Sequence, residues 1–100
     1  MVKHIVMWKL KDAAGGRDRH ENAVIMKKRI EGLKDKIDVI LHIEVGIDVN
    51  RSGAAYDVAL YSEFSDPDAL ETYQEHPDHV DVAGFVAGVT EDRVVVDYTV

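Results

Sequence analysis

Four stretches of alternating apolar residues, separated by only two helical stretches, constrain the fold of this chain more than any other feature. The alternating stretches cover residues 2–10, 39–49, 56–64 and 93–100. An alternation with a period of two is typical of strands that bury one face. The sequence therefore predicts the order β-α-β-β-α-β, with the second helical part broken in two.

The helical stretches begin at recognisable signals. Asp18, followed three residues later by Glu21, is typical of a capping box, and apolar residues then recur at helical spacing. Asp66 followed by Pro67 predicts a second helix start. Because Pro77 disfavours helical geometry at the residue before it, we expect this second helix to break there and a third helix to begin.

This order predicts a single α+β domain over residues 1–100, with a ferredoxin-like, four-stranded antiparallel sheet. Its helices can cover only one face of the sheet. The more apolar strand phase should face them, and it comprises Leu41, Ile43, Val58, Leu60, Val94 and Val96. The opposite phase is mixed in polarity, which indicates a symmetric homodimer that pairs sheet against sheet. The expected interface residues are Ile5, Met7, Ile40, His42, Ala59, Tyr61 and Val95.

Composition excludes several classes of function. The net charge of −7 argues against nucleic acid and anionic membranes as partners. The chain has no cysteine, so it has no disulfide framework and no thiolate nucleophile. No stretch is long enough to span a membrane, and the apolar start is too short for a signal peptide. We therefore expect a cytoplasmic protein.

Candidate chemistry is concentrated in residues 73–80. His79 should lie in the first turn of the helix that begins at Pro77, where the helix dipole disfavours a protonated imidazole. A neutral imidazole is what a general base needs at neutral pH. The hydroxyl of Tyr73, just across the helix break, could donate a hydrogen bond to an enolate oxygen. Asp78 and Asp81 act in the opposite direction and favour the protonated histidine.

A structural interpretation of the same residues is open. Tyr73 could be a core aromatic residue, while His76 and His79 cap or pack a helix. The two histidines beside a proline break give no tetrahedral ligand set, so we expect neither a structural metal nor a cofactor.

Four segments carry a family resemblance: residues 3–6, 56–64, 73–79 and 95–98. The third of them reads Tyr-Gln-Glu-His-Pro-Asp-His. With these segments in this order, the chain resembles the stress-responsive A/B barrel (Dabb) family, whose members are dimeric α+β barrels. The resemblance spans the chain from end to end and implies a homodimer.

The family includes a plant polyketide cyclase, olivetolic acid cyclase. The resemblance implies that His79 is a general base, that Tyr73 orients the substrate or stabilises its oxyanion, and that His4 lines the pocket. Val58 stands where the cyclase has a further pocket histidine, and Leu60 is expected to line the same pocket. The implied ligand is a small apolar or polyketide-like compound.

Three functions remain open from the sequence. The chain could bind a small molecule without an assigned reaction. It could be a cofactor-independent cyclase or lyase that uses His79 and Tyr73. By analogy of fold alone, it could be a cofactor-independent monooxygenase.

Overall fold

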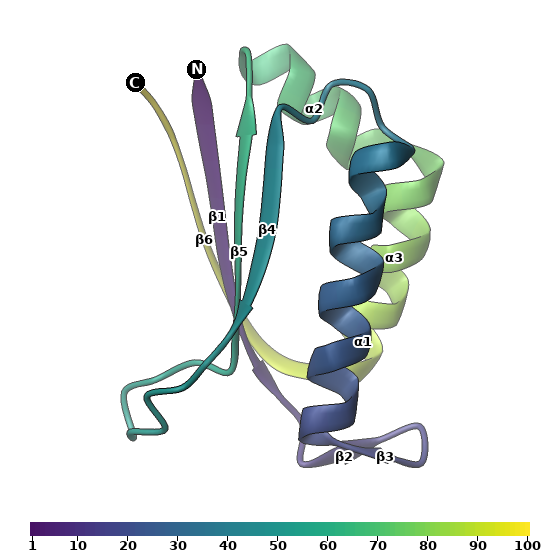
Figure 1. Cartoon of the computed structure of the whole chain (residues 1–100), viewed down its shortest axis with the longest axis vertical. Helices are drawn as coiled ribbons and strands as arrows, with labels where there is room; N and C mark the ends of the chain where they lie inside the picture. The colour runs from purple at the N-terminus through teal and green to yellow at the C-terminus, as the bar shows by residue number, and fades with distance from the viewer.

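The computed structural model describes residues 1–100, with a twisted sheet on one side and all the helices on the other (Figure 1). The strands are β1 (Val2–Leu10), β2 (Ala13–Ala14), β3 (Arg17–Asp18), β4 (His42–Ile47), β5 (Val58–Phe64) and β6 (Thr90–Thr99). The helices are α1 (Arg19–Glu31), α2 (Pro67–Glu75) and α3 (Pro77–Val89), and a 3-10 turn (Gly32–Asp35) follows α1.

The main sheet has the strand order β4-β5-β1-β6, and every neighbouring pair is antiparallel. The predicted ferredoxin-like α+β fold is therefore confirmed. The loop expected between β1 and α1 contains a small hairpin of β2 and β3. Its two turn residues, Gly15 and Gly16, have φ angles of 62° and 78°, a conformation that glycine adopts without a steric cost.

The helix ends follow the predicted signals. Asp18 and Glu21 form a complete capping box at the start of α1. Asp66 caps α2 by accepting a hydrogen bond from the backbone N–H of Ala69 at 2.8 Å. His76 ends α2 and also caps α3, since its Nδ1 accepts a hydrogen bond from the backbone N–H of Asp78. His76 thus marks the break between α2 and α3, which carry Tyr73 and His79.

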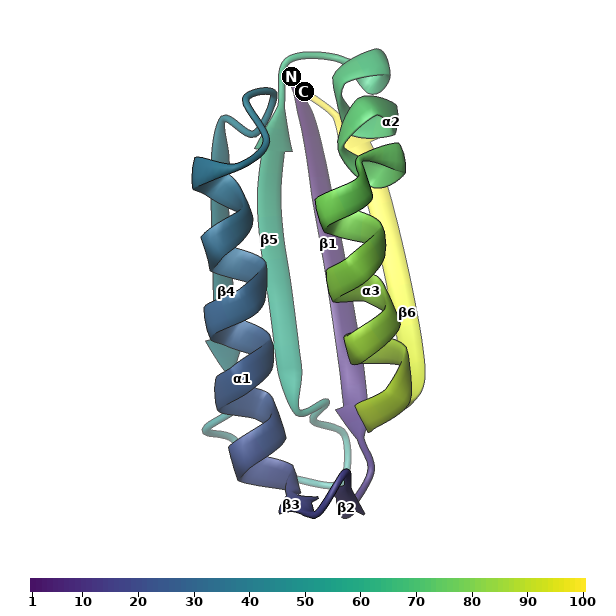
Figure 2. The same ribbon diagram turned by 90° about the vertical axis from the view of Figure 1, so that its right-hand side faces the viewer.

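The helices cover one face of the sheet, and Figure 2 shows α1 in front of β4 and α3 in front of β1 and β6. The core between the layers consists of two clusters of buried side chains. The first cluster lies under α1 and the end of α3: Val6, Trp8, Leu10, Ala23, Met26, Ile30, Val45, Val58, Leu60, Val86 and Val89. The second lies under α2 and the end of α1: Val2, Leu33, Ile37, Ile40, Phe64, Ala69, Leu70 and Tyr73.

The other face of the sheet has no helix over it. Large apolar side chains lie exposed there, including Met7, Val94, Val96 and Tyr98. We call this surface the open face. Five of the residues expected in a dimer interface lie on it by strand register: Ile5, Met7, His42, Ala59 and Tyr61.

Two of the residues expected in the interface, Ile40 and Val95, do not lie on the open face. Ile40 precedes β4, which begins only at His42, and its side chain is buried in the core. Val95 pairs with Val6 and shares its helix-facing side of the sheet, so Val94 and Val96 occupy the open face instead. The phase of β6 was ambiguous because three consecutive valines contain no alternation. Leu41, expected to face the helices, is exposed just before β4.

Candidate active site

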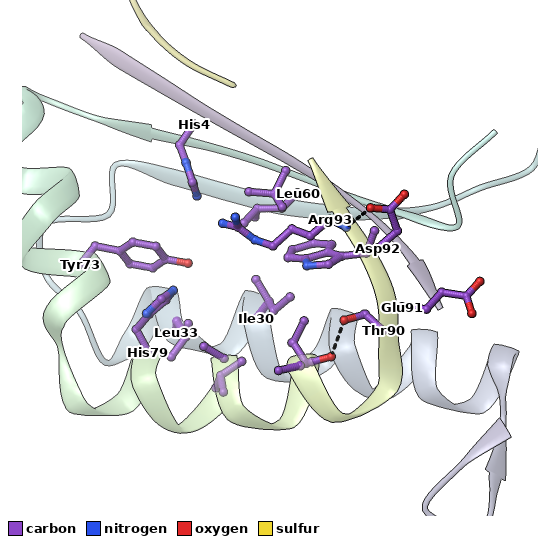
Figure 3. A pocket seen from close by; sticks show the side chains of 16 residues that line it. His4, Ile30, Leu33, Leu60, Tyr73, His79, Thr90, Glu91, Asp92 and Arg93 are labelled. Atoms are coloured by element: carbon purple, nitrogen blue, oxygen red, sulfur yellow. Dashed lines mark hydrogen bonds between the residues drawn. The ribbon is translucent and has the colours of Figure 1, made fainter. Parts of the chain in front are cut away.

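A cavity of about 380 Å³ lies between the helix-facing side of the sheet and the helices α1 and α3 (Figure 3). Its walls are mostly apolar, and a few polar groups converge on it, as is typical of small-molecule sites. The lining side chains are His4, Val6, Trp8, Ile30, Leu33, Leu60, Tyr73, His79, Val82, Ala83, Val86, Ala87, Thr90, Glu91, Asp92 and Arg93.

Tyr73 projects from the last turn of α2 and is almost wholly buried. Its ring packs against that of Phe64, with ring centroids 5.0 Å apart. Figure 3 shows its hydroxyl pointing into the cavity, where it makes no hydrogen bond within the chain. Burial raises the pKa of Tyr73 to about 12, so the phenol stays protonated and remains a hydrogen-bond donor at neutral pH.

His79 lies in the first turn of α3, and its Nδ1 is 3.0 Å from the backbone carbonyl oxygen of Gln74. A carbonyl oxygen can only accept a hydrogen bond, so Nδ1 must carry the proton. In the neutral imidazole the lone pair then resides on Nε2. The backbone of α2 thus fixes the tautomer that leaves a basic nitrogen available to a ligand.

The surroundings of His79 favour its neutral form. Burial lowers the pKa of His79 below its ordinary value, and the hydrogen bond to Gln74 only partly opposes this. The nearby positive charge of Arg93 and the imidazoles of His4 and His76 lower the pKa further. A histidine that is neutral at pH 7 can accept a proton from a bound ligand.

His4, on the helix-facing side of β1, is the third polar group of the cavity and is only 2% exposed. Its Nδ1 forms a hydrogen bond with a carboxylate oxygen of Asp97, which lies opposite it on β6. Its ring meets that of Tyr73 edge-on, with centroids 6.3 Å apart. A carboxylate that accepts from Nδ1 leaves Nε2 as the acceptor nitrogen of the neutral ring.

The structure brings together His4, Leu60, Tyr73 and His79, four of the five residues expected from the sequence. The fifth, Val58, is buried in the core cluster under α1 and does not line the cavity. Trp8 pairs with Val58 across the sheet, and its larger side chain forms this part of the wall instead.

Charged residues of β6 also belong to the site and were not predicted from the sequence. Asp97 holds His4, and Arg93 lines the cavity. Both follow from the register of β6, which places them opposite His4 and Trp8. The available signal was the occurrence of two charged residues four positions apart in one phase of this strand.

No three histidine, aspartate or glutamate side chains gather closely enough to hold a metal ion. None of the helices has both the length and the apolar composition needed to cross a lipid bilayer.

Comparison with known proteins places the chain among relatives of the same fold. An uncharacterised protein of Streptomyces coelicolor is 34% identical over 80 residues, 79% of each chain. A dimeric protein of unknown function with a ferredoxin-like fold, from Bacteroides fragilis, is 43% identical, with a TM-score of 0.81 over 97% of this chain and 93% of that one. A hydroxynitrile lyase from Passiflora edulis shares the fold at 17% identity, with a TM-score of 0.80 over 97% and 90% of the two chains.

At 17% identity the last likeness shows the fold alone. The family model of the stress responsive A/B barrel domain, in contrast, matches residues 2–100. The chain therefore belongs to the stress responsive A/B barrel domain family.

Proposed function

We propose that this protein is a homodimeric, cofactor-independent enzyme that moves a proton on a small carbonyl compound bound in the cavity. His79 acts as the general base and Tyr73 as the hydrogen-bond donor to the developing oxyanion. The cyclase reaction implied by the family resemblance begins with such a step. A monooxygenase remains a prediction from the fold only.

The hydrogen bond between His79 and the carbonyl of Gln74 is the observation that carries this proposal. A general base needs one ring nitrogen whose lone pair is free to accept a proton from the ligand. Here the proton is held on Nδ1 by the protein, so Nε2 is the acceptor. The lowered pKa of His79 supports the same role, because the base is then unprotonated at neutral pH.

In the proposed step, Nε2 of His79 removes a proton from the carbon next to a carbonyl group. The electron pair of the C–H bond becomes the enolate, and its oxygen accepts a hydrogen bond from the phenol of Tyr73. The enolate then attacks a second carbonyl or expels a leaving group, and the imidazolium returns its proton to the product. The apolar side chains of Ile30, Leu33 and Val86 line the cavity and limit the access of water. Because less water is present, the hydrogen bond to the oxyanion is stronger.

The homodimer is supported by two observations. The open face exposes Met7, Val94, Val96 and Tyr98, and a contiguous apolar surface of this kind is typical of an interface. The relative from Bacteroides fragilis, 43% identical, is dimeric. Pairing through the open face would leave the cavity accessible, because the cavity lies on the helix-facing side of the sheet.

The proposal is tested by proton exchange, which needs no knowledge of the natural substrate. The protein is incubated in D₂O with ethyl 2-methylacetoacetate, and deuterium incorporation at the carbon between the carbonyl groups is followed by NMR. We expect catalysed exchange, reduced about 10²–10⁴-fold by His79→Ala and about 10²–10³-fold by Tyr73→Phe. Exchange that equals the rate without protein would leave the cavity as a binding site and reject the enzyme.

A further inference from the structure

Arg93 is the only lysine or arginine that lines the cavity. It lies near the start of β6, opposite Trp8, so its side chain extends over the helix-facing side of the sheet. Figure 3 shows the guanidinium directed along the cavity toward the end where His4 and Tyr73 lie. A permanent positive charge therefore faces a mostly apolar space.

The guanidinium of Arg93 has no hydrogen-bond or ion-pair partner within the chain, although acidic residues outnumber basic ones by 19 to 12. Only its backbone N–H is bonded, to the carboxylate of Asp92 at 2.9 Å. In Figure 3 the carboxylates of Glu91 and Asp92 point away from the guanidinium. The five donors of this group are free for a ligand.

We propose that Arg93 binds the carboxylate of the ligand, so that the cavity takes small organic acids with an apolar body. A guanidinium pairs with a carboxylate through two parallel hydrogen bonds, and such a pair gains strength where water is partly excluded. The apolar body would lie along Val6, Leu60 and Val86. This inference deepens the proposed function, because it names the substrate class of the same cavity.

The sheet register sets the distance between the anion and the reacting atoms. Arg93 lies opposite Trp8, and Asp97 lies opposite His4, so the two levels are four residues apart along β6. Their Cα atoms are therefore about 13 Å apart. The arginine side chain spans part of this distance toward His4 and His79. A carboxylate on Arg93 would thus lie only a few bonds from a carbon that His79 deprotonates.

The binding test uses the tryptophan of the cavity as its probe. Trp8 is the only tryptophan of the chain and lines the cavity, so its fluorescence reports occupancy. The protein is titrated with octanoate and, separately, with octanamide, which has the same length and no charge. We expect octanoate to bind roughly tenfold more tightly, the size of one charge-assisted pair at a partly exposed site. Added salt should reduce this preference.

Two variants that lose the same charge separate the role of Arg93 from that of net charge. Arg93→Met keeps most of the side-chain length, and we expect it to remove the preference for octanoate while octanamide binds as before. Lys28→Met removes a positive charge from the exposed side of α1 and should retain the preference. Arg93→Lys should retain part of it, because lysine offers a point charge without the planar fork.

Equal affinity of the two ligands for the unaltered protein would overturn the inference, as would a preference that survives Arg93→Met. Both variants are checked by thermal unfolding, and Arg93 is exposed, so the fold should be retained. If the proposed enzyme function is wrong but the carboxylate site is right, the two measurements disagree. A preference for octanoate without proton exchange would support the carboxylate site and reject His79 as a catalytic base.

Discussion

The imidazole of His79 lies against the phenol ring of Tyr73, with ring centroids 4.5 Å apart and ring planes inclined by 56°. The two residues are six positions apart, and in one continuous helix they would point about 120° apart around the axis. The break at Pro77 changes the direction of the chain and brings both side chains to the same cavity. Pro77 therefore shapes the site, although it does not line the cavity.

We predict opposite effects for the two histidines that flank the proline. His79→Ala should reduce proton exchange about 10²–10⁴-fold and leave the fold intact, because the side chain is only partly buried. His76→Ala should lower the free energy of unfolding by about 0.5–2 kcal/mol, because it removes the cap of α3, and exchange should continue. Activity is followed by NMR and stability by urea unfolding. Equal loss of exchange in both variants would contradict the assigned roles.

The pH dependence of catalysis should report the neutral form of His79. Because burial lowers the pKa of this residue below its ordinary 6.5, kcat/KM should be constant near pH 7 and fall only at a pH below 6.5. Tyr73, with a pKa of about 12, should cause no loss of activity up to about pH 11. The profile is measured by proton exchange in buffered D₂O. An acidic limb above pH 6.5 would argue against His79 as the base.

The lowered pKa of His79 also predicts how the free energy of unfolding depends on pH. Between the lower folded-state pKa of His79 and 6.5, the unfolded chain binds more protons than the folded one. The free energy of unfolding should therefore decrease as the pH falls through this window and be independent of His79 above it. His79→Ala should lack this component, which is measurable by urea unfolding at a series of pH values.

A charge on the open face should disrupt the dimer. Val96 is 53% exposed in the single chain and lies on that face, so Val96→Glu would bury a carboxylate in the proposed interface. We expect a monomer by light scattering at micromolar concentration. The control is Val24→Glu on α1, where a valine of similar exposure, 46%, lies outside the open face. A dimer that tolerates Val96→Glu would place the interface elsewhere.

On the outer edge of β4, side chains of α1 bond the backbone of Val45. The carboxylate of Glu31 accepts from the backbone N–H of Val45 at 2.9 Å, and the ammonium of Lys27 donates to the carbonyl of the same residue. Glu31→Ala leaves this N–H unpaired and should lower the free energy of unfolding by about 1–3 kcal/mol. The control Glu71→Ala, at an exposed position of α2, should change it by less than about 0.5 kcal/mol. Urea unfolding distinguishes the two.

The sequence predicted the order of the elements, because each start signal is local. The capping box at Asp18 and Glu21, the cap at Asp66 and the break at Pro77 all lie where expected. Strand limits do not follow from the sequence where apolar residues run on without alternation. Residues 39–41 resemble a strand by composition, yet Ile40 instead packs against the core from the loop before β4.

The sequence by itself determined the ferredoxin-like order of the elements and the helix break between Tyr73 and His79, since both depend on local signals along the chain. Only the tertiary structure decided which side of β6 faces the helices. Three consecutive valines carry no period-two signal, so the hydrogen-bond register with β1 sets the phase. That register places Arg93 at the cavity and Asp97 beside His4, and the charged part of the site is therefore a product of strand pairing.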